Sequence, residues 1–212
     1  MKRATRLLAS TFGVIVGLVG GEHAVGAILQ GNTRLDSIVF ASWPDAEAYR
    51  VLAGEPAMTL VPNTLVTGIL ALLVSLVTAV WAVFFVHRRH GGLVLILLSV
   101  LLLLVGGGFG PPVVGIITGS AALGLAAPAK GGPARSSGLP RFLAALWPYV
   151  LFVAVAGYLS LFPGLVLYAH ATGVSDSLAP VYLTPFSFGA LILAIVSARA
   201  RDRLTQARST AA

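Results

Sequence analysis

An acidic and a basic residue stand side by side in an otherwise apolar stretch near the start of this chain. Glu22 and His23 interrupt the run GLVGGEHAVGAILQGN, which covers residues 17 to 32. A carboxyl group and an imidazole in apolar surroundings can bind a proton or a cation, or serve as general acid and base. Neighbouring helical positions differ by about 100°, so the two side chains need not contact each other. The pair is the first candidate for a functional site.

Further polar residues are expected at the same depth. Glu22 lies 15 residues beyond Leu7, where the apolar run begins, which places it roughly 22 Å along a helix. Polar residues at the ends of other apolar runs should lie at the same depth in the membrane as Glu22. We therefore hypothesise an outward-facing polar pocket formed by Glu22, His23, Gln30, Asn63, His170 and Asp176. The alternative is a polar plug that only hydrogen-bonds helix ends and exposed glycine backbone.

The chain carries no motif that would identify an enzyme. It has no G-x-x-x-x-G-K-[ST] phosphate loop, no H-E-x-x-H zinc helix and no G-x-S-x-G nucleophile turn. The HRRH segment at 87–90 falls in a predicted interior loop, where its arginines fix membrane orientation. The absence of cysteine excludes disulfides and thiolate ligands. We expect no metal and no cofactor, and the sequence leans against catalysis.

Composition indicates an integral membrane protein. Of the 212 residues, 57% are hydrophobic and 10% are charged, whereas about a quarter are charged in soluble domains. The net charge of +7 comes from basic residues in short clusters between apolar runs, as is typical of membrane orientation signals. The expected partner is the lipid bilayer, and no nucleic-acid partner is expected.

Polar clusters divide the chain into six apolar runs, and a helix needs about 20 apolar residues to cross a membrane. The predicted fold is all-α, a single membrane domain over residues 1–212 built as a bundle of about six transmembrane helices. The predicted spans are 7–29, 62–86, 93–107, 112–127, 142–168 and 180–198, with an external segment at 30–61 and a cytoplasmic tail at 199–212.

The third and fourth spans are separated only by GGGFGPP at 106–112. Glycine and proline there favour a turn between two short helices. A single kinked span with a re-entrant tail is the alternative, which would leave five spans.

The basic residues support six spans with both termini in the cytoplasm. With the N-terminus inside, 12 of the 14 lysines and arginines fall in interior segments, and only Arg34 and Arg50 lie outside. The expected location is the cytoplasmic membrane of a bacterium. Residues 1–27 also resemble a cleaved secretory signal in outline, and cleavage would remove Glu22 and His23. The apolar run resumes after this pair, which favours a continuous span.

Two further elements are predicted from local signals. Ser42 can cap a helix, and Gly54 with Pro56 can end one, so we predict a short amphipathic external helix over 43–53 that covers the bundle or acts as a lid. Glycines recur every fourth residue in the first and fourth spans, which lets another backbone approach. Contact between these two helices, or a homodimer seam, is expected at Gly13, Gly17, Gly21, Gly115 and Gly119.

Two classes of function fit these residues, with a third that has no chemistry. A small transporter or channel component would use Glu22 as a proton or cation site. A membrane-embedded enzyme acting on a lipid or quinone would use Glu22, His23 or His170 as acid and base groups. An accessory subunit would bind a membrane-protein partner or form a homo-oligomer. Transport or an accessory role is favoured, because the sequence supplies one ionisable site and no recognisable reaction machinery.

Overall fold

The fold is nearly all-α, as predicted, with helix making up 75% of the chain. It is known from a computed structural model, which describes residues 2–45, 53–125, 138–174 and 178–211. The helices are α1 (Arg3–Leu29), α2 (Thr64–Phe84), α3 (Gly91–Leu104), α4 (Gly110–Ala122), α5 (Gly138–Leu159), α6 (Leu165–Thr172) and α7 (Ala179–Ala211), with a π-helical turn (Ser160–Gly164) between α5 and α6. Strands β1 (Val39–Ala41) and β2 (Pro56–Met58) pair antiparallel between α1 and α2.

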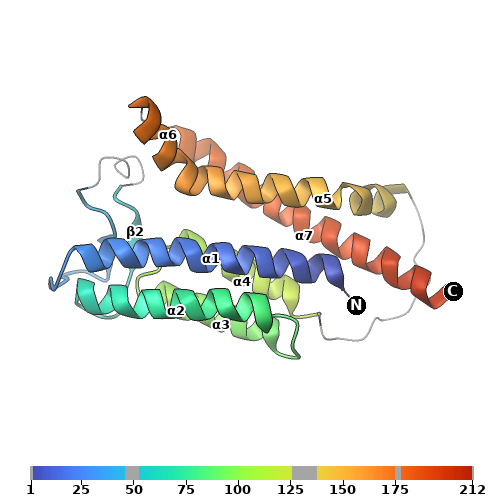
Figure 1. The fold of residues 1–212 in the computed structure, drawn as a ribbon, viewed down its shortest axis with the longest axis horizontal. Helices are drawn as coiled ribbons and strands as arrows, with labels where there is room; N and C mark the ends of the chain where they lie inside the picture. Colours follow the sequence, from blue (N-terminus) through green and yellow to red (C-terminus); the bar gives the residue numbers. More distant parts are fainter. Residues whose placement is uncertain (1, 46–52, 126–137, 175–177, 212) are drawn as a thin grey trace.

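Helix α1 lies at the centre of the molecule. It packs along α2 and also contacts α4 and α7. Helices α3 and α4 pack against each other, and α5 and α7 form an antiparallel pair on the other side of α1 (Figure 1). Both ends of the chain lie at the same end of the molecule (Figure 1).

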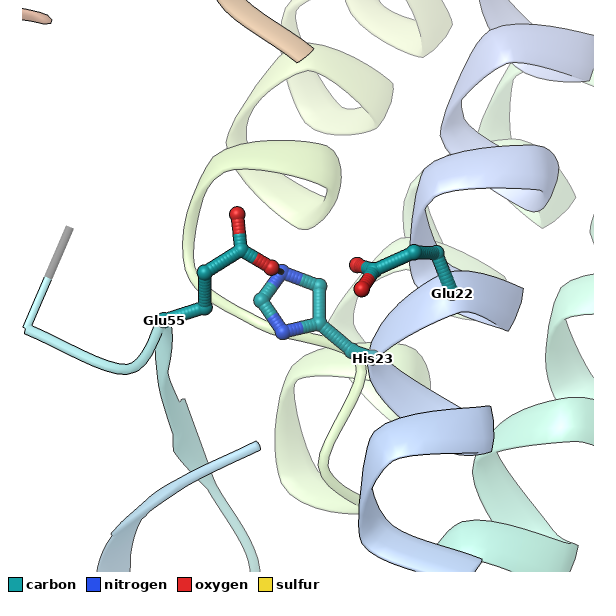
Figure 2. A group of neighbouring side chains, drawn as sticks. All are labelled: Glu22, His23 and Glu55. Atoms are coloured by element: carbon teal, nitrogen blue, oxygen red, sulfur yellow. Dashed lines mark ion pairs between the residues drawn. The ribbon is translucent and has the colours of Figure 1, made fainter. Parts of the chain in front are cut away.

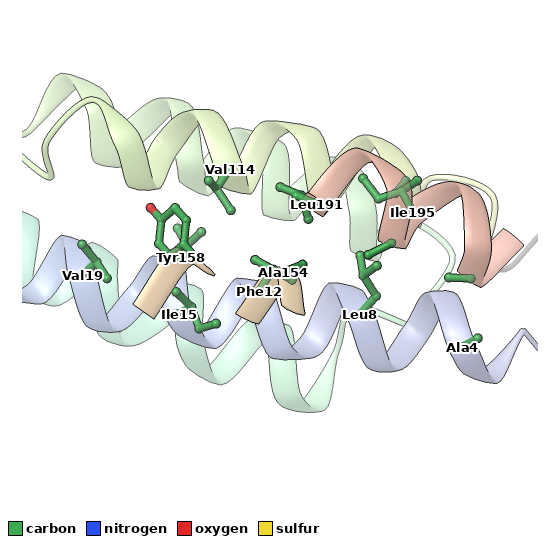
Figure 3. Packing of buried hydrophobic residues seen from close by; sticks show 14 of the residues in the cluster. Ala4, Leu8, Phe12, Ile15, Val19, Val114, Ala154, Tyr158, Leu191 and Ile195 are labelled. Atoms are coloured by element: carbon green, nitrogen blue, oxygen red, sulfur yellow. The ribbon is translucent and has the colours of Figure 1, made fainter. Parts of the chain in front are cut away.

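The main core follows one side of α1. Leu8 and Phe12 of α1 are fully buried and belong to the same cluster as Val114 of α4, Tyr158 of α5 and Leu191 of α7 (Figure 3). The rings of Phe12 and Tyr158 meet edge to face, with 6.3 Å between their centroids. The central helix therefore holds the two halves of the molecule together.

Four helices are long and apolar enough to cross a membrane, namely α1, α2, α5 and α7. The surface of α2 supports a membrane environment. Leu73, Leu76 and Val80 are exposed, whereas Ser75 and Thr78 are buried. A soluble helix would place these residue types the other way round, but small and polar residues between helices with large apolar residues outside are expected in lipid.

Helices α3 and α4 are shorter than their predicted spans, 93–107 and 112–127. They contain 14 and 13 residues, which rise about 21 and 20 Å, less than the hydrocarbon core of about 30 Å. The predicted turn at 106–112 does separate two helices, with Gly106 and Gly108 at positive φ. Among the described residues, four helices are long enough for a complete crossing, and α3 and α4 form a shorter hairpin.

The segment before α2 packs onto the end of this hairpin. The Leu60 amide donates to the Leu104 carbonyl at 3.0 Å, and Thr59 pairs with Val105. Thr59 is 2% exposed. The predicted external segment 30–61 therefore reaches into the molecule in part, and this carries the neighbouring Glu55 into a buried position.

Most of the predicted external helix, residues 46–52, lies outside the described residues. Residues 43–45 and 53–54 on either side form bends and turns. Ser42, which was expected to cap that helix, instead places its hydroxyl 2.9 Å from Nδ1 of His23. The imidazole of His23 is therefore the polar partner of the Ser42 hydroxyl, where a backbone amide was expected.

Helices α1 and α4 do contact each other, as expected, but the glycines of α1 face α2. Gly13 and Gly17 pack against Ala82, Ser75 and Ala79 of α2. The nearest neighbours of Gly21 are Ser75 and Leu72, also on α2. Gly13 and Gly17 are buried within one chain.

The glycines of α4 mainly face α3. Gly115 lies against Ser99 of α3 and Val16 of α1, and Gly119 lies against Gly92 and Ile96 of α3. Small residues do permit close backbone approach, as expected. The closest approaches at these glycines are between α1 and α2 and between α3 and α4, which are neighbours in sequence.

The predicted tail at 199–212 continues α7 as helix through Ala211. Its Asp202 accepts hydrogen bonds from the amides of Ala4 at 2.9 Å and Thr5 at 3.0 Å. The first amides of a helix have no partner within the helix and favour negative charge. Asp202 therefore joins the two ends of the chain by capping α1.

Candidate functional site

Three ionisable side chains meet at one point of the structure. Glu22 and His23 belong to α1, and Glu55 directly precedes β2. Each offers an oxygen or nitrogen atom, and these atoms all lie within 4.8 Å of one another. Figure 2 shows both carboxyl groups directed toward the imidazole. Nε2 of His23 is 3.8 Å from Oε2 of Glu55. We call these three residues the Glu–His–Glu cluster.

A second layer of polar contacts holds the imidazole. Nδ1 of His23 and the Ser42 hydroxyl are 2.9 Å apart. Gln30 donates from Nε2 to the Ser42 carbonyl at 2.8 Å and to the Ala41 carbonyl at 3.0 Å. The Ser42 amide donates to the Glu55 carbonyl at 3.0 Å. His23 and Glu55 are thus fixed relative to each other through one serine.

The turn between α3 and α4 closes another side of the imidazole. Gly108 has φ of +76°, and a Cβ at this position would collide with the His23 ring. Both the conformation and the space therefore require glycine. The sequence predicted that GGGFGPP separates two helices. In the structure the backbone of this turn also packs against His23.

Glu55 adopts a backbone conformation that is unusual for its residue type. Its φ is +55°, and Ala53 has φ of +51°. Non-glycine residues in this left-handed region cost of order 1–3 kcal/mol each, and such strain is concentrated at functional sites. The strain at Glu55 accompanies the placement of its carboxyl group beside Glu22 and His23.

The cluster borders a pocket of about 200 Å³ that is partly open. His23 and Glu55 line it together with Tyr158 of α5, Leu161 of the π-helical turn and Thr184 of α7. His23 and Glu55 are 6% and 5% exposed. The described lining residues include no lysine or arginine.

Burial, the negative charge of Glu22 and a hydrogen bond with Glu22 together raise the pKa of Glu55 to about 10. Glu55 therefore retains a proton at neutral pH when no other cation is near.

The other residues of the predicted pocket have separate positions. Gln30 contributes indirectly, through Ser42. Asn63 caps α2 by accepting from the Val66 amide at 3.0 Å. His170 is exposed in the last turn of α6 and does not line the pocket. Asp176 lies outside the described residues.

Glu55 is the member of the cluster that sequence reasoning missed. It lies in an irregular segment, and no periodicity indicates where such a segment folds. The one available signal was its position between Gly54 and Pro56, which marks a tight turn. The expectation of no metal site was made without this third side chain.

Comparison with protein-family models, curated proteins and solved structures finds no match for this chain.

Proposed function

We propose that this protein is a small multi-pass membrane transport component that takes up a cation at Glu22 and Glu55. The observation that carries the proposal is the meeting of the Glu22 and Glu55 carboxyl groups with the His23 imidazole at one point, beside a pocket that Glu55 and His23 line. Buried charges are costly unless they are paired. Ionisable residues in this setting typically mark ion or proton pathways.

Two breaks in regular helix flank the pocket and support a transport role. The turn at 106–108 ends α3 beside His23, and the π-helical turn Ser160–Gly164 places Leu161 in the pocket wall. Interrupted helices surround ion sites in many transporters, and π-helical turns are frequent at functional sites.

The distribution of basic residues supports the orientation that this function needs. We place both termini in the cytoplasm of a bacterial cell, with α1, α2, α5 and α7 crossing the membrane and α3 and α4 entering it from the cytoplasmic side. The pocket then faces the exterior, because Glu22 lies toward the end of α1 that is remote from Lys2 and Arg3.

Catalysis on a lipid or quinone is the weaker candidate. The acid and base groups expected for it included His170, which is exposed on α6 and does not line the pocket. Tyr158 and Thr184 add hydroxyl groups to the described lining, but no sequence motif assigns either of them a nucleophilic role.

The test is cation uptake by liposomes that contain the purified protein. A potassium gradient with valinomycin sets a negative interior, and enclosed dyes report the influx of protons and of divalent metal ions separately. We expect influx above that of empty liposomes, and a loss of at least about tenfold in Glu22→Gln and in Glu55→Gln.

Asp36→Asn is the matched control, because Asp36 is an exposed carboxylate outside the pocket. It should retain the wild-type rate. Equal influx with and without the protein, or full influx in both glutamine variants, would contradict the transport proposal.

A further inference from the structure

The Glu–His–Glu cluster has the composition of a site for a divalent transition-metal ion. Imidazole nitrogen and carboxylate oxygen are common ligands of zinc and related ions. The candidate ligand atoms of Glu22, His23 and Glu55 lie within 4.8 Å of one another. Ligand atoms around a zinc ion, at about 2.0–2.2 Å each, lie somewhat closer together, so small side-chain rotations would complete the site.

The contacts of His23 resemble the outer layer of a metal site. A histidine that binds a metal usually donates its other ring N–H to a polar group, which fixes the ring and its tautomer. Ser42 occupies that position at Nδ1, with 2.9 Å between the two atoms. In the tautomer with Nδ1–H donating to Ser42, Nε2 presents its lone pair on the side where Oε2 of Glu55 lies.

The surroundings are also prearranged for a bound ion. The Gly108 backbone packs against the imidazole, and the strained φ of Glu55 is held by the Ser42 contact described above. A ligand set on fixed supports needs little reorganisation to bind. The pocket beside the cluster leaves room for a further ligand such as water, as at metal sites with an open position.

Charge selects a divalent ion. A metal ion that binds here displaces the proton of Glu55, and the two carboxylates with a neutral imidazole then carry a charge of about −2, which one divalent ion balances. Sodium and potassium favour all-oxygen sites of lower charge, and magnesium keeps several waters, so the nitrogen ligand favours zinc-like ions.

We infer that the cation bound by this protein is a divalent transition-metal ion held by Glu22, His23 and Glu55. The inference rests on the proposed function only where it concerns movement of the metal ion across the membrane. Binding of the ion requires only the Glu–His–Glu cluster.

The experiment is a Zn²⁺ titration of the purified full chain in detergent by calorimetry, after treatment with a chelator. We expect one Zn²⁺ per chain. Glu22→Gln, His23→Gln and Glu55→Gln should each weaken binding by at least about tenfold. His170→Gln is the control for a surface histidine and should bind as the wild type does, because His170 is exposed on α6.

Ser42→Ala distinguishes a specific effect on metal binding from a general loss of folding. It leaves all three ligands in place, and loss of an outer-layer partner typically weakens metal binding by about 10–100-fold. Co²⁺ in place of Zn²⁺ gives a visible absorption band that reports its ligand geometry, and this band should shift in Ser42→Ala while the secondary structure by circular dichroism stays unchanged.

The outcomes separate the two proposals. Failure of the wild type to bind Zn²⁺ or Co²⁺, or binding that survives all three ligand variants, would overturn the metal site even if proton influx in liposomes depends on Glu22. Zn²⁺ binding that requires the cluster, without any cation influx, would uphold the metal site and end the transport proposal.

Discussion

At the scale of single residues, the site depends on how Glu55 and Gly108 are placed around His23. Neither residue attracts notice in the sequence as a partner of His23. Glu55 is 33 positions away from Glu22 in the chain, and Gly108 belongs to a glycine-rich turn. In the structure both residues have positive φ. The carboxyl group of Glu55 lies beside the His23 imidazole, and the backbone of Gly108 packs against the same ring.

Gly108→Ala should disturb His23 directly. The added Cβ would collide with the ring, and φ of +76° would add strain, so we expect destabilisation of about 1–3 kcal/mol and weaker Zn²⁺ binding. Gly31→Ala is a matched control, because Gly31 has φ of +71° but no atom within 4 Å of the added Cβ. Thermal unfolding and Zn²⁺ titration of both variants would measure the difference. Equal Zn²⁺ affinity in the two variants would contradict the role assigned to Gly108.

Glu55 should make the metal-free protein less stable as pH rises. Its pKa is raised from 4.5 to about 10 by burial and by Glu22, so the folded state binds a proton that the unfolded state has lost above pH 4.5. Stability is therefore greatest below about pH 4.5 and falls with rising pH up to about pH 10. Melting temperatures in chelator from pH 5 to 9 should fall in the wild type and fall less in Glu55→Gln. Parallel curves for the two proteins would show that Glu55 is not protonated in the fold.

At the scale of elements, the hairpin of α3 and α4 explains how a loop residue becomes buried. These helices end short of a full crossing, and the segment around Thr59 packs on the end of α3. A longer α3 would occupy the space into which residues 55–60 fold. The site toward the C-terminal end of α1 therefore follows from the short helices as much as from Glu22 and His23.

The contact between the two ends of the chain is a second element-scale feature. Asp202 accepts from the first amides of α1 and is 5% exposed. Asp202→Ala should lower the free energy of unfolding by about 1–2 kcal/mol, measured by thermal unfolding in detergent. Asp36→Ala, at an exposed carboxylate, should have little effect. An unchanged melting temperature in Asp202→Ala would show that the cap adds no stability.

At the scale of the whole molecule, the sequence predicted the helices well and the site only in part. Apolar runs between polar clusters located all the long helices, because length and hydropathy alone decide which segments suit a membrane. They could not show that α3 and α4 stop early, since the apolar residues continue past their ends. They also could not place Glu55, because irregular backbone follows tertiary contacts and has no period.

The orientation of the whole molecule can be tested with single cysteines, since the chain has none. In intact bacterial cells, a maleimide that cannot cross the membrane should label Asp36→Cys and should not label Arg203→Cys until the cells are opened. Both positions are exposed, so access to the reagent should decide the result. The reverse pattern would place the termini and the pocket on the opposite sides.

The most direct measurement is a structure of the protein determined with Zn²⁺, with the anomalous scattering of zinc recorded. The account predicts one strong peak at about 2.0–2.2 Å from Nε2 of His23 and from carboxylate oxygens of Glu22 and Glu55. A cluster with the three side chains in place and no peak between them, at Zn²⁺ concentrations that saturate the calorimetric titration, would contradict the claim that these residues form one cation site.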